Sequence, residues 1–186
     1  MSLVVEYGPQ QAYSAFFNDA PVTRHSPAVF DAFVNQTKVK FLRTDGCRIS
    51  KCFFQFWGER LYAQDKSVTL NATAETFDKD FFSHGSDSAY PPDRSQAVFP
   101  SALALEWSNS SLDDTMAFAL RSFADAIRDA ALADGQDVSH AAKYPNYALF
   151  GTPLKDMYSR NVERLRKIRA AIDPDDVMGL TGGWKF

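Results

Sequence analysis

The sequence has few cysteines and histidines, and they do not form a metal-binding pattern. Cys47 and Cys52 are its only cysteines, and the three histidines of the 186-residue chain are scattered. Two cysteines make no disulfide framework, and a zinc site needs further cysteine or histidine ligands nearby. We therefore predict two ordinary thiols and no metal site.

The chain also lacks a long hydrophobic run and an excess of positive charge. No apolar stretch approaches the roughly 18 residues that a membrane span needs. The first ten residues, MSLVVEYGPQ, lack the basic start and apolar stretch of a signal peptide. The formal net charge is −3, whereas nucleic-acid binding takes a clustered basic surface. We therefore predict a cytoplasmic protein that binds neither membranes nor nucleic acid.

Aromatic residues, by contrast, are abundant: the chain has sixteen Phe, seven Tyr and three Trp. They could fill a core or line a pocket for a flat organic molecule, and we assign most of them to the core because Phe is readily buried. A hydrophobic content of 45% is that of a globular protein. The length suits a single domain, residues 1–186, in which residues 1–26 stay unassigned.

The segment SPAVFDAFVNQT, residues 26–37, predicts a helix. Ser26 can cap it, and Pro27 fits its first turn. Its apolar residues fall on one helical face: Val29, Phe30, Phe33 and Val34.

The clearest helical pattern follows Ser111. Asp113 and Asp114 place negative charge in its first turn, and Gly135 suits a left-handed end. Its predicted buried stripe is Met116, Leu120, Phe123 and Ile127. A last helix is predicted from its cap Thr152 to the stop at residues 173–174. The apolar stripe of that helix is Leu154, Met157, Leu165, Ile168 and Ile172.

Three segments predict strands. Residues 51–63 are rich in strand-forming aromatics and lead into a turn at Gly58, and residues 67–73 also favour a strand. In residues 101–107, Leu103, Leu105 and Trp107 alternate on one face. Residues 83–100 hold Gly, Ser, Asp and paired prolines, which predict a long ordered loop. The sum is an α+β fold, with a mostly antiparallel sheet and helices packed on one face.

Several blocks of the chain resemble a known family. They are HGSDSAYPPDRS (84–95), ADGQDV (133–138), YPNYALFGTPLKDMY (144–158), NVERLRKIRAAIDPDDVMGL (161–180) and TGGWKF (181–186). In this order they resemble the C-terminal half of fungal FAD-linked oxidoreductases of the berberine-bridge-enzyme-like group. The likeness is weaker over residues 27–62, and residues 1–26 show none.

The resemblance implies two parts in a full-length relative. An N-terminal half binds FAD, and a later half forms the substrate-binding sheet and helices. This chain resembles the later half only, and it has no glycine-rich flavin-phosphate loop or flavin-attachment motif. Because the chain starts with Met and stops at the family's own end, we expect a complete product. We expect no cofactor of its own, and FAD only if a partner chain supplies it.

The resemblance also implies a site. In the family the Y-x-N-Y segment lies beside the flavin ring, and a tyrosine there often acts as a base. The segment maps onto Tyr144, Asn146 and Tyr147, with the two tyrosines as catalytic candidates and Asn146 as a substrate contact. Because a free phenol has a pKa of about 10, Tyr147 acts as a base only beside a flavin or a cation such as Lys143. Otherwise it donates a hydrogen bond to a substrate carbonyl, or both tyrosines simply pack under the last helix.

The loop at residues 83–100 adds further candidates. His84 and Asp87 form either an acid–base pair or a hydrogen-bonded turn. Arg94 either clamps a substrate carboxylate or holds the loop by pairing with Asp87 or Asp93. We count His84 among the catalytic candidates and the other two among the substrate contacts. Three aromatic residues are further candidates for substrate contact: Phe54, Phe56 and Trp107.

Three functions remain open at this point. The preferred one is a free-standing, flavin-independent enzyme of secondary metabolism that cyclises or isomerises a small hydrophobic or aromatic metabolite, since such a step needs only shape, desolvation and a few hydrogen-bond donors. The second is the substrate-binding half of a split oxidoreductase, completed by a separate FAD-binding chain. The third is a non-catalytic binding or oligomerisation module. Trp184 and Phe186, predicted to be exposed, indicate a homodimer through the C-terminal face.

Overall fold

The computed structural model describes residues 14–37, 57–75, 81, 84, 88–91 and 98–186. Its strands and helices follow in the order β1 (Ser14–Asp19), α1 (Pro27–Thr37), α2 (Trp57–Gln64), β2 (Thr69–Ala74), β3 (Ser101–Trp107), α3 (Asp113–Ala133), α4 (Leu154–Tyr158) and α5 (Val162–Ile172). Short 3₁₀ turns precede α3 (Ser110–Leu112), join α4 to α5 (Ser159–Asn161) and follow α5 (Met178–Thr181). The predicted α+β class is confirmed.

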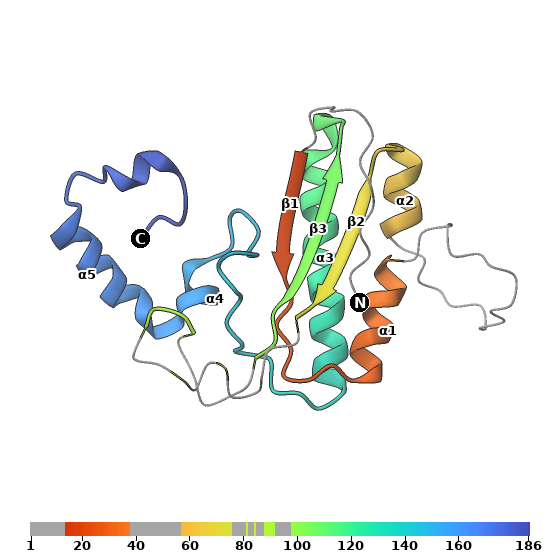
Figure 1. The fold of residues 1–186 in the computed structure, drawn as a ribbon, viewed down its shortest axis with the longest axis horizontal. Coiled ribbons are helices and arrows are strands. Elements are labelled where there is room, and N and C mark those ends of the chain that lie inside the picture. Colours follow the sequence, from red (N-terminus) through yellow and green to blue (C-terminus); the bar gives the residue numbers. More distant parts are fainter. Residues whose placement is uncertain (1–13, 38–56, 76–80, 82–83, 85–87, 92–97) are drawn as a thin grey trace, which may run out of the picture.

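The three strands form an open antiparallel sheet in the order β1-β3-β2 (Figure 1). In the central strand, Leu105 lies opposite Phe16 of β1 and Leu70 of β2. Leu103, Leu105 and Trp107 are all buried, because successive side chains of a strand point to opposite faces and this face carries the core. The predicted one-sided strand is therefore confirmed.

Helix α3 covers the buried face of the sheet (Figure 1). Its four predicted stripe residues, Met116, Leu120, Phe123 and Ile127, are all buried, and Gly135 ends the helix with the predicted positive φ of 76°. The 3₁₀ turn before α3 is capped by the Asn109 side chain, which accepts the Ser111 N–H, whereas α3 itself has no side-chain cap.

Helix α1 packs against α3, with the rings of Phe33 and Phe123 6.2 Å apart. Ser26 Oγ accepts a hydrogen bond from the Val29 N–H at 3.4 Å, as its predicted capping role requires. Only part of the predicted apolar stripe is buried. Val29 and Phe33 lie in the core, whereas Phe30 and Val34 remain about half exposed.

Residues 57–64 form helix α2, so the strand predicted over residues 51–63 is wrong for this part. Arg60, Leu61, Ala63 and Gln64 are good helix formers, and their preference outweighs that of the aromatic residues before them. Leu61 is fully buried in the core cluster, whereas Arg60 and Gln64 are exposed. Residues 51–56 lie outside the described residues.

The single helix predicted over residues 152–172 is divided into α4 and α5. Ser159 interrupts it with a φ of 45°, and α5 starts at Val162. Met157 is buried, but Ile168 and Ile172 are 47% and 81% exposed. The break turns α5 so that its predicted apolar stripe does not reach the core.

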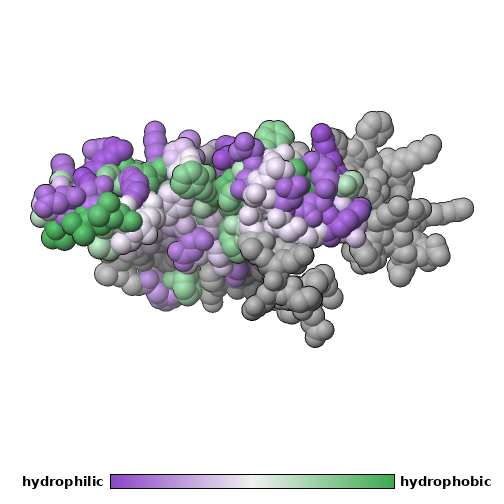
Figure 2. Space-filling view, turned by 90° about the horizontal axis from the view of Figure 1, so that it is seen from above, coloured by the Kyte–Doolittle hydropathy of each residue, from purple (hydrophilic) through white to green (hydrophobic). Residues whose placement is uncertain are grey.

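Helices α4 and α5 and the C-terminal segment lie beside the sheet (Figure 1). Apolar side chains are exposed at that end of the molecule, where the space-filling view shows a hydrophobic patch (Figure 2). We name it the apolar C-terminal surface: Ile168, Ile172, Val177, Met178 and Leu180. No helix within the described ranges is both long and apolar enough to cross a membrane.

The two aromatic residues predicted to be exposed at the C-terminus are half-buried instead. Trp184 Nε1 donates a hydrogen bond to the Pro145 carbonyl oxygen at 3.3 Å. The Phe186 ring packs 5.2 Å from the ring of Tyr158. These side chains therefore hold the C-terminal segment against Pro145 and Tyr158, and they are not the exposed anchors that the dimer prediction assumed.

Candidate functional site

A buried carboxyl group, that of Asp19, joins the end of β1 to the segment that carries the predicted tyrosines. Its Oδ1 accepts a hydrogen bond from the Ser101 N–H at 2.9 Å, and its Oδ2 accepts one from the Tyr144 N–H at 2.5 Å. Burial raises the pKa of Asp19 to about 7, although these N–H groups and the charge of Lys143 oppose the shift. Asp19 therefore holds the Tyr144 segment on the sheet and titrates near neutral pH.

Three tyrosines gather above this contact. The ring of Tyr144 lies 5.4 Å from that of Tyr90 and 5.0 Å from that of Tyr147. Asn146 Nδ2 donates a hydrogen bond to the Tyr144 hydroxyl at 2.8 Å. Burial raises the pKa of Tyr90, whose hydroxyl donates to the Ala142 carbonyl oxygen. The structure thus brings Tyr144, Asn146 and Tyr147 together, and adds Tyr90, which the sequence did not indicate.

Tyr147 pairs with an acidic residue of the sheet. Its hydroxyl donates a hydrogen bond to Glu75 Oε1 at 3.2 Å. Burial and the negative charge of Glu75 raise the pKa of Tyr147, so the phenol keeps its proton at neutral pH. This shift is opposite to the one that a tyrosine base requires, and it favours the alternative in which Tyr147 donates a hydrogen bond.

Glu75 itself is held in place by its backbone. Its N–H donates to the Pro100 carbonyl oxygen at 3.1 Å, which continues the pairing of β2 with β3. Its carbonyl oxygen lies 3.0 Å from His25 Nε2, so this nitrogen must carry the ring proton. The Glu75 side chain is therefore presented to Tyr147 from a fixed point at the end of β2.

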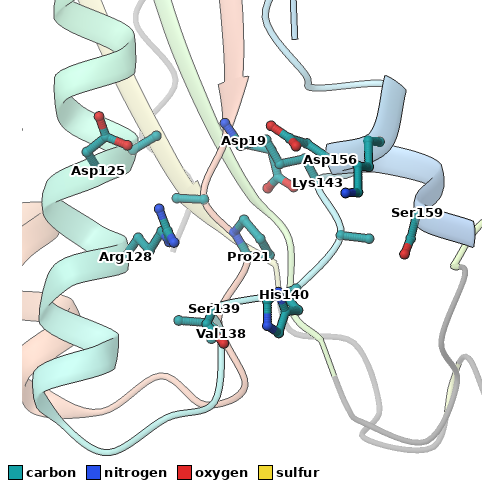
Figure 3. A pocket seen from close by; sticks show the side chains of 15 residues that line it. Asp19, Pro21, Asp125, Arg128, Val138, Ser139, His140, Lys143, Asp156 and Ser159 are labelled. Atoms are coloured by element: carbon teal, nitrogen blue, oxygen red, sulfur yellow. The ribbon is translucent and has the colours of Figure 1, made fainter. Parts of the chain in front are cut away.

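A cleft of about 500 Å³ opens on the other side of Asp19 (Figure 3). It is bounded by the end of β1, by α3, by residues 138–143 and by α4. Neither Tyr144 nor Tyr147 lines it, and Asp19 and Lys143 connect the two regions. The charged or titratable residues of its wall are Asp19, Asp125, Arg128, His140, Lys143, Lys155 and Asp156.

Trp107, predicted to contact substrate, lies in the core instead. It is fully buried, its Nε1 donates a hydrogen bond to Asp113 Oδ1 at 2.8 Å, and its ring lies 4.9 Å from that of Phe16. A side chain so enclosed cannot reach a ligand, so this assignment is corrected. The alternation of residues 101–107 had already placed Trp107 on the buried face of the strand, and that prediction is the one that the structure confirms.

Of the remaining candidates, only His84 lies within the described residues. His84 is exposed and lies in the loop before β3. Four predicted contacts lie outside the described residues and stay predictions: Phe54, Phe56, Asp87 and Arg94. Within the described ranges, no group of three His, Cys, Asp or Glu side chains is placed to hold a metal ion.

The described helices α1, α3 and α5 do not follow a turn of the kind that binds the pyrophosphate of FAD. A flavin-phosphate loop is a glycine-rich turn that leads into a helix N-terminus, where backbone N–H groups face the pyrophosphate. The helices α1, α3 and α5 begin instead after Ser26, Leu112 and Asn161. Gly151 precedes α4, but that helix has only five residues.

Comparison with protein-family models gives a match for part of the chain. Residues 143–181 match the family model described as "Berberine and berberine like". No curated protein and no solved structure matches the chain significantly. The matched segment includes Tyr144, Asn146 and Tyr147 together with α4 and α5. It supports a relation of this segment to the berberine-bridge-enzyme-like family, and so to FAD-linked oxidoreductases.

Proposed function

We propose that this chain binds a small hydrophobic or aromatic metabolite and catalyses a non-redox proton transfer on it, an isomerisation or a cyclisation. The observation that carries this proposal is the contact of Tyr147 with Glu75, a phenol that keeps its proton beside an acidic side chain. The chain needs no flavin of its own for such a step. We propose, in addition, that the protein acts in secondary metabolism and in the cytoplasm.

The chemistry follows from the two groups. Tyr147 donates a hydrogen bond to a substrate carbonyl oxygen and so stabilises the negative charge that develops there. Glu75, as the carboxylate, takes the proton from the neighbouring carbon. It then returns that proton at another position, so that no electrons are gained or lost. Tyr147 is partly exposed, which leaves its hydroxyl open to a substrate.

The other candidates have supporting roles in this proposal. Tyr144 and Asn146 are hydrogen-bonded to each other, and they offer polar contacts beside Tyr147. His84 serves as a second acid or base. We expect further substrate contacts from Phe54, Phe56, Asp87 and Arg94, which is why the loop at residues 83–100 belongs to the proposed site.

Hydrogen–deuterium exchange tests the proposal without knowledge of the natural substrate. The protein is incubated in D₂O with a panel of aryl ketones and 1,3-diketones, and NMR follows the exchange of protons next to the carbonyl. We expect catalysed exchange, and a loss of about 100-fold or more in Tyr147→Phe and in Glu75→Gln. The control Tyr62→Phe, on α2, keeps full activity. Exchange that persists in both variants, or no exchange with any ketone, contradicts the proposal.

A second candidate is the substrate-binding half of a split oxidoreductase, with FAD on a separate chain. The apolar C-terminal surface favours it, because large exposed apolar patches mark interaction sites. An absorption spectrum from about 300 to 550 nm of protein purified from its own host separates the two candidates. Flavin bands that co-elute with a second chain support the split enzyme. A colourless protein that ignores added FAD supports the first candidate.

A further inference from the structure

The cleft beside Asp19 collects positive charge from three separate parts of the chain. Arg128 extends into it from α3, and Lys143 comes from the loop before the tyrosine cluster (Figure 3). Lys155 of α4 also lines the cleft. Within the described part of the chain none of these three side chains forms an ion pair, whereas Arg24 and Arg169 each pair with an aspartate at 2.8 and 2.9 Å. Cations that line one cleft repel one another, and a bound anion relieves that repulsion.

The acidic residues of the cleft form no ion pair with these cations in the described part of the chain. The carboxyl group of Asp19 is buried and already accepts two backbone N–H groups, so it does not face a ligand. Asp125 and Asp156 also line the cleft, but neither forms an ion pair with a described residue. Three cations therefore face two available carboxylates. A ligand with an anionic group can bind the three cations, and its hydrogen-bond donors can bind the two carboxylates.

Small side chains create the space for such a ligand. The walls between the charged groups are formed largely by alanine and proline: Ala20, Pro21, Ala124, Ala141 and Ala142. The resulting volume of about 500 Å³ lies within the usual range for small-molecule sites, roughly 300–1,000 Å³. Small and charged side chains thus line the cleft, unlike the aromatic surroundings of Tyr147.

We propose that this cleft binds a small organic anion, a carboxylate or phosphate that also carries hydroxyl or amino groups, and that Arg128, Lys143 and Lys155 hold its anionic group. Arg128 offers a planar pair of donors for two oxygens, and the lysines act as point charges. His140 and Ser139 at the cleft wall supply further hydrogen-bonding groups. The site is distinct from the pair Tyr147–Glu75, and it goes beyond the proposed proton transfer.

Titration with two defined anions tests the site. The full chain, at constant ionic strength in chloride, is titrated with inorganic phosphate and separately with succinate, and ¹⁵N-resolved NMR follows the backbone shifts of residues 138–143. We expect saturable binding of at least one anion, with a Kd of about 5 mM or below. Arg128→Gln and Lys143→Gln each weaken it by about tenfold or more. Phosphate alone indicates a phosphorylated ligand, and succinate alone indicates a carboxylate.

A matched control lies on the same helix. Arg121 is exposed on α3, two turns before Arg128, and does not line the cleft. Arg121→Gln therefore removes the same charge and leaves binding unchanged. An equal loss in Arg121→Gln, or no saturation with either anion up to about 50 mM, overturns the proposal. Lys155→Gln, on the exposed side of α4, provides a further test if either principal variant unfolds.

Discussion

Asp19 Oδ2 accepts a hydrogen bond from the Tyr144 N–H at 2.5 Å, although 125 positions separate the two residues in the chain. The contact places the segment that matches the berberine family model directly against the end of β1. It also sets Tyr147 toward Glu75 on one side and Lys143 toward the cleft on the other. Asp19 is thus the structural link between the two proposed sites.

The pKa of Asp19 predicts a pH dependence of stability. Its pKa is raised to about 7 in the folded state from an ordinary value of 3.8. The folded state thus holds the proton where the unfolded chain has lost it, so the stabilisation is complete below about pH 4 and is lost as the pH rises through 7. We expect this group to lower the free energy of unfolding by up to about 4 kcal/mol over that window.

The variant Asp19→Asn should remove this pH dependence of the free energy of unfolding, because an amide does not titrate. Urea unfolding at several values of pH from 4 to 8 measures it, and the difference between wild type and variant isolates the Asp19 contribution. Asp125→Asn, an exposed carboxylate on α3, is the control and should keep the wild-type slope. Equal slopes in wild type and Asp19→Asn would falsify the assignment.

Gln136 is predicted to stabilise the connection between β1 and α1. Its Oε1 accepts hydrogen bonds from the N–H groups of Thr23 and Arg24 at 3.0 and 3.1 Å, and its Nε2 donates to the Arg24 carbonyl oxygen at 3.1 Å. Gln136→Ala leaves these backbone groups without partners, and we expect the free energy of unfolding to fall by about 2 kcal/mol. Urea denaturation measures the change.

Two comparisons make the Gln136 test specific. Gln136→Glu keeps an accepting oxygen but sets a carboxylate oxygen against the Arg24 carbonyl oxygen and Asp134 Oδ2, so it should also lower the free energy of unfolding. Gln64→Ala removes an exposed glutamine that bonds only to its own helix, and it should have little effect. If Gln136→Ala is as stable as the wild type, Gln136 does not stabilise the connection between β1 and α1.

Ser159 is expected to be a strained position. Its φ of 45° and ψ of −120° lie in a region that side chains disfavour and glycine adopts freely. Ser159→Gly should therefore raise the free energy of unfolding by up to about 1 kcal/mol, whereas Ser159→Ala should not. Thermal unfolding of the two variants shows the difference, and a glycine variant that melts below the alanine variant contradicts it.

The apolar C-terminal surface predicts association. If a second copy covers it, as we propose for a homodimer, light scattering at micromolar concentration gives a dimer mass for the wild type. The double variant Ile172→Lys/Leu180→Lys places two charges on this surface and should be monomeric, because burial of an unpaired charge is strongly unfavourable. Phe150→Lys, at an apolar residue exposed elsewhere, should remain dimeric. A monomeric wild type rules out the homodimer.

The periodic elements of the fold could be predicted from the sequence because their signal is local. The alternation in residues 101–107 and the stripe from Met116 to Ile127 both report one buried face, and the structure confirms them. The strand expected over residues 51–63 is wrong over residues 57–63, because the aromatic residues favour a strand whereas the residues after them favour a helix. The break at Ser159 has no such signal, since serine is common within helices and near their ends alike.

The site was predictable only in its C-terminal part. Tyr144, Asn146 and Tyr147 were found through their resemblance to a family motif, and the structure places them together. Asp19, Glu75 and Arg128 were missed, because each gains its importance from a neighbour more than 15 residues away. One signal was available: Asp19 closes a short aromatic strand, and an acidic residue there is unusual unless something holds it.

The strand order β1-β3-β2 has a consequence for the timing of folding during synthesis. Ser14 of β1 pairs with Trp107 of β3, so the first strand has no partner until more than half of the chain has been made. At a ribosomal rate of about 5–20 residues per second, β1 waits for several seconds with both edges open. Asp19 waits longer still, until Tyr144 emerges. A ribosome that stalls between residues 107 and 144 would display all three strands while Asp19 still lacks its hydrogen bond from the Tyr144 N–H. Chaperones and proteases would then act on this incompletely stabilised sheet.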